Sequence, residues 1–165
     1  MKEDQNDLAL LHAEESFWKY PFRRGWSADE TAAFLERTIQ RYEDPGMAVS
    51  AVVVAGTGQL AGWAGLSIPT FLPEILPAVE VGWRLGERFR GNGYATEAGA
   101  AWIRVGFEEL DLESIVSIYE PDNTASGAVM RRLGFTFERE TTHPTHKSTV
   151  HVLELTRERW RQLNP

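Results

Sequence analysis

Apolar and polar residues alternate with two periods along the chain, and each period predicts a type of element. Apolar residues that recur every three or four positions predict amphipathic helices. Ser27 followed by Glu30 has the spacing of a capping box, which predicts a helix start. Helices are expected over residues 4–18, 27–41, 94–110, 124–133 and 156–163.

The remaining apolar runs are short and have the residue types of strands. Gly56-Thr57-Gly58 predicts a turn that joins two of them in a hairpin. Pro69, Pro73 and Pro77 predict a loop before the next strand, and loops of this kind often border a site. Strands are expected over residues 47–55, 59–67, 78–85, 114–119, 135–140 and 149–155.

Length and composition indicate one domain that spans residues 1–165. A chain of 165 residues can bury one sizeable core and is short for two. Its 42% hydrophobic and 25% charged residues exclude a disordered chain. No apolar run approaches the roughly 20 residues of a spanning helix, and the acidic start does not resemble a signal peptide. We therefore expect a cytoplasmic protein without membrane attachment.

Charge and residue types narrow the chemistry further. The net charge of -7 argues against nucleic-acid binding and modestly favours a cationic acceptor. The absence of cysteine excludes disulfides, thiolate nucleophiles and Cys-based zinc sites. His143 and His146 flank a loop proline, with His151 beyond, and this spacing does not fit a metal site. We expect no metal.

The strongest chemical signal is the turn Arg90-Gly91-Asn92-Gly93, between an expected strand and an expected helix. Backbone N–H groups at a helix start are unpaired and have the positive end of the helix dipole behind them. Glycines adopt backbone angles that other residues resist, and they have no Cβ to block a ligand. Several amides can therefore converge on a phosphate, and the turn predicts a pyrophosphate ligand.

Two common nucleotide-binding motifs explain the turn less well. A P-loop is excluded because no Gly-Lys-Ser/Thr ends the turn. Gly91 and Gly93 begin a dinucleotide-binding pattern, but Thr96 stands where the third glycine belongs. Hairpins also precede the turn, where a dinucleotide-binding fold would begin with a βαβ unit.

The segment Arg-x-x-Gly-x-Gly at residues 88–93 resembles the CoA-binding signature of GNAT acetyltransferases. The resemblance extends from about Ala51 to Trp160 and favours the ribosomal-protein-alanine (RimJ/RimL-type) branch. Relatives usually open with a strand before the first helix, and we expect this first strand to be absent here. Further matching segments are Val81–Leu85, Gly93–Ala98, Asp122–Ser126 and Leu133–Phe135.

The resemblance implies the GNAT fold, an α/β (α+β) arrangement whose mixed, mostly antiparallel sheet is flanked by helices. Strand 78–85 is expected to splay from strand 114–120 and to admit the pantetheine arm of acetyl-CoA like an added strand. The Leu85 backbone N–H is expected to face the thioester oxygen. The implied cofactor-binding residues are Trp83, Leu85, Arg88, Arg90, Gly91, Asn92, Gly93, Tyr94, Ala95, Asn123 and Ser126.

Two residues are expected to act in catalysis, Glu80 and Ser126. Glu80 lies on the splayed strand and could deprotonate the amine, unless strand alternation turns it away. Many GNAT enzymes carry a tyrosine general acid seven residues after the asparagine, but here Met130 has no proton to give. Ser126, one helical turn earlier, is the expected proton donor or an ordinary first-turn serine. Asn123 is either a pantetheine contact or a helix cap.

The function implied is an acetyl-CoA-dependent N-acetyltransferase that acts on a primary amine, either a protein N-terminus or a small molecule. Two alternatives stay open: a non-catalytic acyl-CoA-binding module, and the same enzyme with another donor such as succinyl-CoA. Homodimerisation is also left open. Aromatic residues of the first third are expected mostly in the core, or else in an acceptor cleft. These residues are Phe17, Trp18, Tyr20, Phe22 and Trp26.

Overall fold

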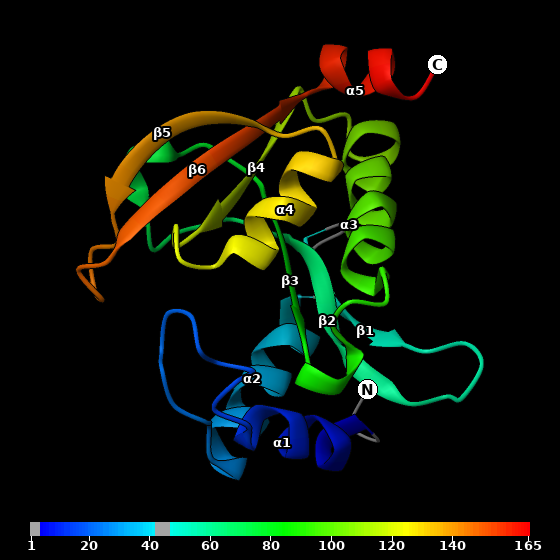
Figure 1. Ribbon diagram of the computed structural model, residues 1–165, viewed down its shortest axis with the longest axis vertical. Helices are drawn as coiled ribbons and strands as arrows, with labels where there is room; N and C mark the ends of the chain where they lie inside the picture. Colours follow the sequence, from blue (N-terminus) through cyan, green and yellow to red (C-terminus); the bar gives the residue numbers. More distant parts are fainter. Residues whose placement is uncertain (1–3, 42–46) are drawn as a thin grey trace.

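The computed structural model describes residues 4–41 and 47–165 and has a six-stranded sheet at its centre (Figure 1). The strands lie in the order β1-β2-β3-β4-β6-β5. Neighbouring strands are antiparallel except β3 and β4, which are parallel, so the mixed, mostly antiparallel sheet is confirmed. The strands are β1 (Val49–Val53), β2 (Leu60–Ser67), β3 (Glu80–Leu85), β4 (Ser114–Tyr119), β5 (Thr136–Thr142) and β6 (Thr149–Thr156).

Helices flank the sheet on its faces and at both ends. Figure 1 shows α1 and α2 together at one end of the sheet and α5 at the other. Helix α3 packs on β2 and β3, and α4 packs on β4. No helix in the described parts of the chain is long and apolar enough to cross a membrane. The helices are α1 (Gln5–Ala13), α2 (Ala28–Arg41), α3 (Tyr94–Arg104), α4 (Thr124–Arg132) and α5 (Arg157–Leu163).

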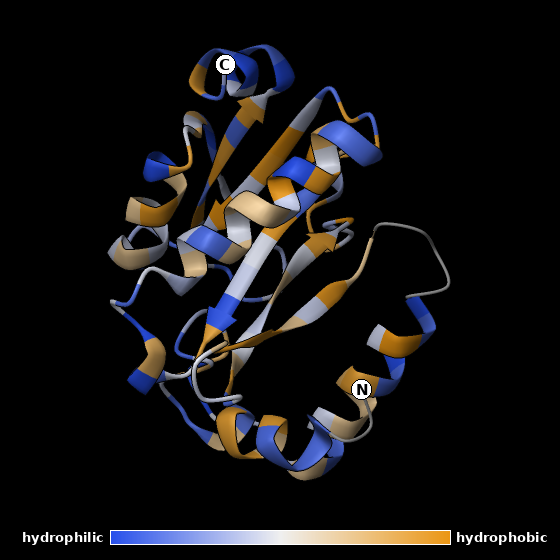
Figure 2. Ribbon diagram, turned by 90° about the vertical axis from the view of Figure 1, so that its right-hand side faces the viewer, coloured by the Kyte–Doolittle hydropathy of each residue, from blue (hydrophilic) through white to orange (hydrophobic). Residues whose placement is uncertain are grey.

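The main core fills the space between the sheet and helices α3 and α4. Val81 of β3, Ile115 of β4 and Leu155 of β6 are completely buried there, against Ile103 of α3 and Met130 of α4. Figure 2 shows the corresponding apolar stretches along the strands, while the helices carry both apolar and polar residues. Burial of this apolar face fixes β3 and β4 on the same side of α3 and α4.

Local signals in the sequence set several helix ends. Helix α2 begins with the expected capping box, in which Glu30 N donates to Ser27 Oγ (3.2 Å) and Ser27 N donates to a Glu30 carboxylate oxygen (2.9 Å). The third expected helix consists of α3 and one π-helical turn, Val105–Glu109. Thr156 caps α5 by accepting a hydrogen bond from Arg159 N (3.2 Å).

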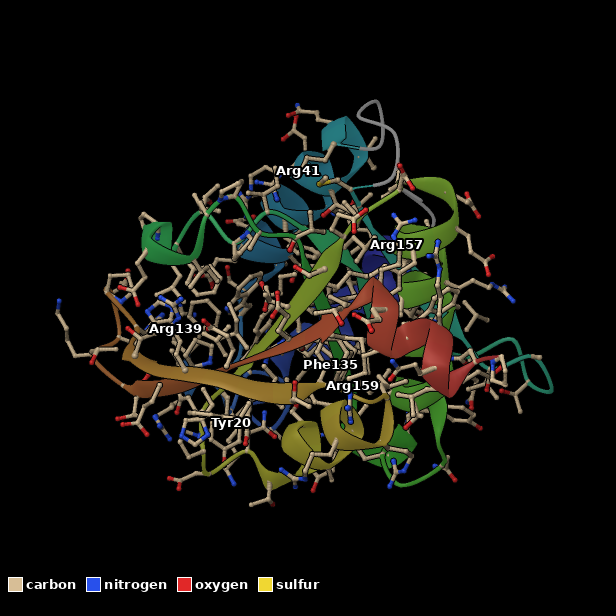
Figure 3. The ribbon with its side chains drawn as sticks, turned by 90° about the horizontal axis from the view of Figure 1, so that it is seen from above. Tyr20, Arg41, Phe135, Arg139, Arg157 and Arg159 are labelled. Carbon is tan, nitrogen blue, oxygen red and sulfur yellow. The ribbon has the colours of Figure 1, made fainter. Side chains whose placement is uncertain are left out.

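The C-terminal helix is attached to the end of the sheet by two arginines (Figure 3). Arg157 donates to the Leu112 carbonyl oxygen at 2.9 and 2.6 Å. Arg159 donates to the carbonyl oxygen of Gly134, the residue at which α4 turns toward β5 (2.6 Å). None of the residues of α5 is buried, so these charge-assisted contacts contribute to holding the helix in place.

The first helix ends earlier than the pattern of apolar residues predicts. Helix α1 stops at Ala13, and residues 14–26, which we call the strap, continue as turns and irregular backbone to the start of α2. Phe17 and Trp18 are buried within the strap, and Trp18 stacks on Trp26 with ring centroids 3.6 Å apart. Tertiary packing of these rings therefore overrides the helical period.

Strands β3 and β4 separate almost as soon as they meet. Their single paired position is Glu80 with Val116, next to a hydrogen bond from Val116 N to the Val79 carbonyl oxygen (2.9 Å). Ser117 Oγ then donates to the Val81 carbonyl oxygen (2.9 Å), and Figure 1 shows the two strands diverging beyond this point. The expected splay is present, with its closed end at Glu80.

Candidate active site

A cavity of about 950 Å³ lies where β3 and β4 diverge. Its wall includes residues of the strap, β3, the turn before α3, the end of β4, and α4. A volume near the upper end of the range for small-molecule sites is sufficient for an extended arm together with a compact acceptor. The splay, the glycine turn and the aromatic strap thus open into one space.

The backbone of β3 presents every second peptide group to this cavity. Residues on a strand alternate the side to which their N–H and C=O point. Because the carbonyl oxygens of Val79 and Val81 accept hydrogen bonds from β4, the peptide groups of Trp83 and Leu85 point to the same side. At Trp83 and Leu85, β4 is no longer paired with β3. The edge of β3 therefore offers a ladder of backbone donors and acceptors to an extended ligand.

The glycine turn has the backbone conformation that its sequence predicts. Gly91 and Gly93 have φ values of 79° and 86°, in the left-handed region that side chains disfavour, and Gly93 is the N-cap of α3. A Cβ built on either glycine would meet no atom of the described residues within 4 Å. The conformation therefore requires glycine, while the space beside the turn remains accessible to a ligand.

The polar side chains around the turn mostly bind the protein itself. Arg90 donates through Nε to the Leu85 carbonyl oxygen (3.2 Å) and through Nη2 to the Ser16 carbonyl oxygen of the strap (2.6 Å). Asn92 Nδ2 donates to the Phe89 and Arg90 carbonyl oxygens. Arg88 lies over the Phe89 ring, at 4.6 Å from its centroid. Their cofactor contacts remain predictions, and Arg90 also links the cofactor turn to the strap.

Glu80 faces the cavity at the closed end of the splay, and strand alternation does not turn it away. Burial raises the pKa of its carboxyl to about 7, against the opposing effect of the positive charge of Arg84. A carboxylic acid with such a pKa exchanges a proton near neutral pH. This property is suited to a general base.

Asn123, Ser126 and Met130 all line the cavity from α4 or its start. Asn123 Oδ1 accepts a hydrogen bond from Ser126 N (3.3 Å), so the helix-cap interpretation of Asn123 is correct at least for this oxygen. Ser126 is half-buried, and Met130 is 2% exposed and packs into the main core. Tyr94 and Ala95, in the first turn of α3, line the same cavity.

Arg84 connects β3 to the strap, a role that no motif in the sequence indicates. Arg84 Nη1 donates to the carbonyl oxygens of Phe17 (2.7 Å) and Tyr20 (2.8 Å), and its guanidinium lies 4.4 Å from the Trp18 ring centroid. Burial lowers the pKa of Arg84 to about 10, helped by the charge of Arg90. The positive charge of Arg84 therefore interacts with the carbonyl oxygens and the Trp18 ring of the cavity wall itself.

The sequence analysis also missed Glu120, which holds the strap against the end of β4. Glu120 is 7% exposed, pairs with Arg23 Nη2 (2.8 Å) and accepts a hydrogen bond from Ser148 Oγ (3.1 Å). Tyr20 Oη donates to the Asp122 carbonyl oxygen (3.1 Å) beside it. The only local signal was an acid directly after a strand, because Arg23 and Glu120 lie 97 positions apart in the chain.

The histidines are used in ways unrelated to a metal. His143 Nδ1 accepts hydrogen bonds from the backbone N–H groups of Thr145 and His146, at 3.2 Å each. His151 Nε2 lies 3.0 Å from a Glu140 carboxylate oxygen. Within residues 4–41 and 47–165, no three His, Cys, Asp or Glu side chains come together as metal ligands would.

Comparisons with known proteins agree with this arrangement. The acetyltransferase (GNAT) domain family matches residues 1–136. FsC-acetyl coenzyme A-N(2)-transacetylase from Aspergillus fumigatus is 34% identical over 113 residues, which cover 62% of this chain and 48% of that protein. The uncharacterized N-acetyltransferase YnaD from Bacillus subtilis is 36% identical over 55 residues, 33% of this chain and 32% of that one. The chain thus spans between a third and a half of these curated relatives.

Solved structures share the fold. A GNAT-family acetyltransferase from Bacillus anthracis superposes with a TM-score of 0.79 at 21% identity, over 96% of this chain and 92% of that chain. RimL, a ribosomal-protein acetyltransferase solved in complex with coenzyme A, gives 0.77 at 18% identity, over 94% and 90%. A spermidine N-acetyltransferase variant from Vibrio cholerae gives 0.73 at 16%, over 100% and 96%.

At these identities the structural similarity shows the fold alone, and enzymes with different acceptors share it about equally. The family match is broader, since it covers residues 1–136 of the chain. Enzymes of this family use acetyl-CoA as a cosubstrate. The match to more than half of the chain, with the mixed sheet and its splayed strand pair, shows that the protein belongs to the GNAT acetyltransferase family.

Proposed function

We propose that the protein is an N-acetyltransferase that moves an acetyl group from acetyl-CoA to a primary amine by direct attack of the amine on the thioester. One observation carries the proposal: the glycine turn, the backbone edge of β3 and the carboxyl of Glu80 border the same cavity. A phosphate-binding turn alone is compatible with many ligands. Its combination with an unpaired strand edge and a carboxyl of raised pKa favours acyl transfer.

Acetyl-CoA fits the order of these features along the cavity. Gly91, Gly93 and the first turn of α3, with Tyr94 and Ala95, are positioned to bind the pyrophosphate. The other proposed contacts follow from this position. Peptide groups of β3 bind the pantetheine amides, polar side chains near the turn bind further phosphate oxygens, and the start of α4 binds the thiol end. These contacts are Trp83 and Leu85, then Arg88, Arg90 and Asn92, and finally Asn123 and Ser126.

The side chains at the closed end of the splay supply the proton transfers. Glu80, when ionised, accepts a proton from the amine through water as the N–C bond forms and the C–S bond breaks. Water is needed because the Leu85 N–H, assigned to the thioester oxygen in this proposal, lies five residues farther along β3, roughly 16 Å from Glu80. The Leu85 backbone N–H stabilises negative charge on the thioester oxygen. Ser126 and the N-terminus of α4 stabilise the leaving thiolate, which takes its proton from solvent, either directly or through the Ser126 hydroxyl as solvent returns a proton to that oxygen.

The acceptor in this proposal is a protein N-terminus or a small-molecule amine. The RimJ/RimL-type motifs between Val81 and Phe135 support the first, and the net charge of -7 is compatible with any cationic amine.

Met130 favours a second candidate function, an acyl-CoA-binding module without catalysis, because the usual tyrosine acid is missing there. Release of CoA that depends on added amines supports the enzyme, whereas binding of acetyl-CoA without such release supports the module. Use of succinyl-CoA in the same assay would identify another donor.

The first prediction concerns the cofactor turn. Acetyl-CoA should raise the melting temperature, since it binds the native state, and Gly93→Val should remove most of this rise because the left-handed turn cannot form. Gly58→Val is the matched control, with a φ of 69° in the β1–β2 hairpin away from the cavity. The measurement is the rise in melting temperature that acetyl-CoA causes in each of the two variants. A full shift in folded Gly93→Val would place the phosphates elsewhere.

The second prediction concerns the general base. Because Glu80 must be ionised to accept a proton, kcat/KM should fall as pH decreases through about 7, the raised pKa of its carboxyl. Glu80→Gln should lower kcat by roughly 100-fold and abolish this inflection. Glu36→Gln, at an exposed acid of α2 outside the cavity, serves as control. An unchanged pH profile in Glu80→Gln would exclude Glu80 as the base.

The third prediction concerns the leaving group. Ser126→Ala should lower kcat by roughly 10- to 1000-fold and leave the Kd of acetyl-CoA within a few-fold. Thr124→Ala removes a neighbouring exposed hydroxyl of the same helical turn and should behave like wild type. Both rates are measured with saturating acceptor. Wild-type turnover in a folded Ser126→Ala protein would leave solvent as the proton source.

A further inference from the structure

Four rings from three separate loops meet at one part of the cavity wall. They are Phe22 of the strap, Phe71 between β2 and β3, and His143 and His146 between β5 and β6. Phe22 contacts His146 (ring centroids 5.2 Å apart), His146 contacts His143 (4.6 Å), and His143 stacks on Phe71 (5.0 Å, planes 13° apart). We call these four residues the aromatic rim.

Both phenylalanines of the aromatic rim keep much of their surface accessible. Phe22 is 39% exposed and Phe71 is 37% exposed, although both line the cavity. Trp18 and Phe17, in the same cavity wall, are at most 3% exposed and belong to the core. Partly exposed apolar rings that gather at a cavity wall are typical of ligand-binding sites.

His143 adds the flat face of an imidazole ring to the aromatic rim. His143 Nδ1 accepts two backbone hydrogen bonds, which assigns its proton to Nε2 in the neutral form. Burial lowers the pKa of His143, and the neighbouring His146 lowers it further, although Glu120 acts in the opposite direction. A neutral imidazole stacked on Phe71 offers a flat face that does not repel a cationic amine.

The charged groups of the cavity indicate where the amine lies. In the described part of the chain, the carboxylates that line the cavity are Glu80 and Glu120. Glu120 is already held by Arg23 and Ser148, which leaves Glu80 as the partner for an ammonium group. Arg84 donates to strap carbonyl oxygens and lies under Trp18, so it is not arranged to bind a carboxylate on the acceptor.

The strap limits the size of an acceptor in this half of the cavity. The bond from Tyr20 Oη to the Asp122 carbonyl oxygen and the ion pair of Arg23 with Glu120 connect the strap to the end of β4. Phe22, between these two contacts in sequence, reaches His146 on the β5–β6 loop. The strap and the end of β4 are joined by these contacts. A compact molecule therefore fits between them better than a folded protein acceptor does.

We propose that the acceptor is a small primary amine that carries an aromatic ring and no neighbouring carboxylate. Its ring packs on the aromatic rim, and its ammonium group is directed toward Glu80. This assignment rests on the proposed function, because it identifies the aromatic half of the cavity as the acceptor site.

Phenethylamine and ethylamine test the assignment, since they share an ammonium group and differ by the phenyl ring. Calorimetry on protein saturated with CoA should give at least tenfold tighter binding of phenethylamine, from the burial of its ring. With acetyl-CoA, kcat/KM for phenethylamine should be higher by a similar factor. Both preferences should fall to about threefold or less in Phe71→Ala and in Phe22→Ala.

Phe137→Ala is the matched control, because Phe137 is 60% exposed on β5 and does not line the cavity. Phe22→Leu and Phe71→Leu retain apolar volume and test the need for a ring if an alanine variant does not fold. Tighter binding of phenethylamine without any acetyl transfer would contradict the proposed enzyme and would support only the aromatic rim as a binding site for aryl amines. Equal use of both amines, or preferred use of an alanyl peptide N-terminus, would overturn the acceptor class and leave the enzyme in place.

Discussion

The separation of β3 from β4 after one paired position, Glu80 with Val116, is the constraint on which the rest of the site depends. A parallel pair that continued would satisfy the peptide groups of Trp83 and Leu85 and leave no cavity. The separation costs backbone hydrogen bonds, and the fold supports it through the buried apolar face of both strands under α3 and α4. Ser117 Oγ, bound to the Val81 carbonyl oxygen, satisfies one group at the closed end.

Two arginines connect the proposed cofactor side of this opening to the proposed acceptor side. Arg84 on β3 binds two strap carbonyl oxygens, and Arg90 in the glycine turn binds a third, that of Ser16. A hydrogen bond to a charged group contributes roughly 1.5–3 kcal/mol where it is buried, so the part-buried bonds of Arg84 hold the strap more firmly than the exposed bond of Arg90. On this account the position of the acceptor wall depends on the same strand and turn that bind acetyl-CoA.

Local features of the site could be predicted from the sequence, and long-range ones could not. The glycine turn and the capping box each depend on a few neighbouring residues, and the structure has both. The end of α1 at Ala13 was missed, because Phe17 and Trp18 pack against β2, α2 and each other. Arg84 and Glu120 were missed as wall residues because their partners in the strap are 64 to 97 positions away. The cofactor and catalytic roles remain predictions, since only a bound ligand or a rate can test them.

Amide hydrogen exchange along β3, followed by NMR, tests the central claim most directly. The amides of Gly82 and Arg84 point toward β2, so they should exchange slowly with or without acetyl-CoA. The amides of Trp83 and Leu85 point into the splay, so they should exchange faster in the free protein and become protected when acetyl-CoA binds. Protection of both amides on binding is the result that the account predicts. Saturating acetyl-CoA that leaves both amides unprotected would contradict it.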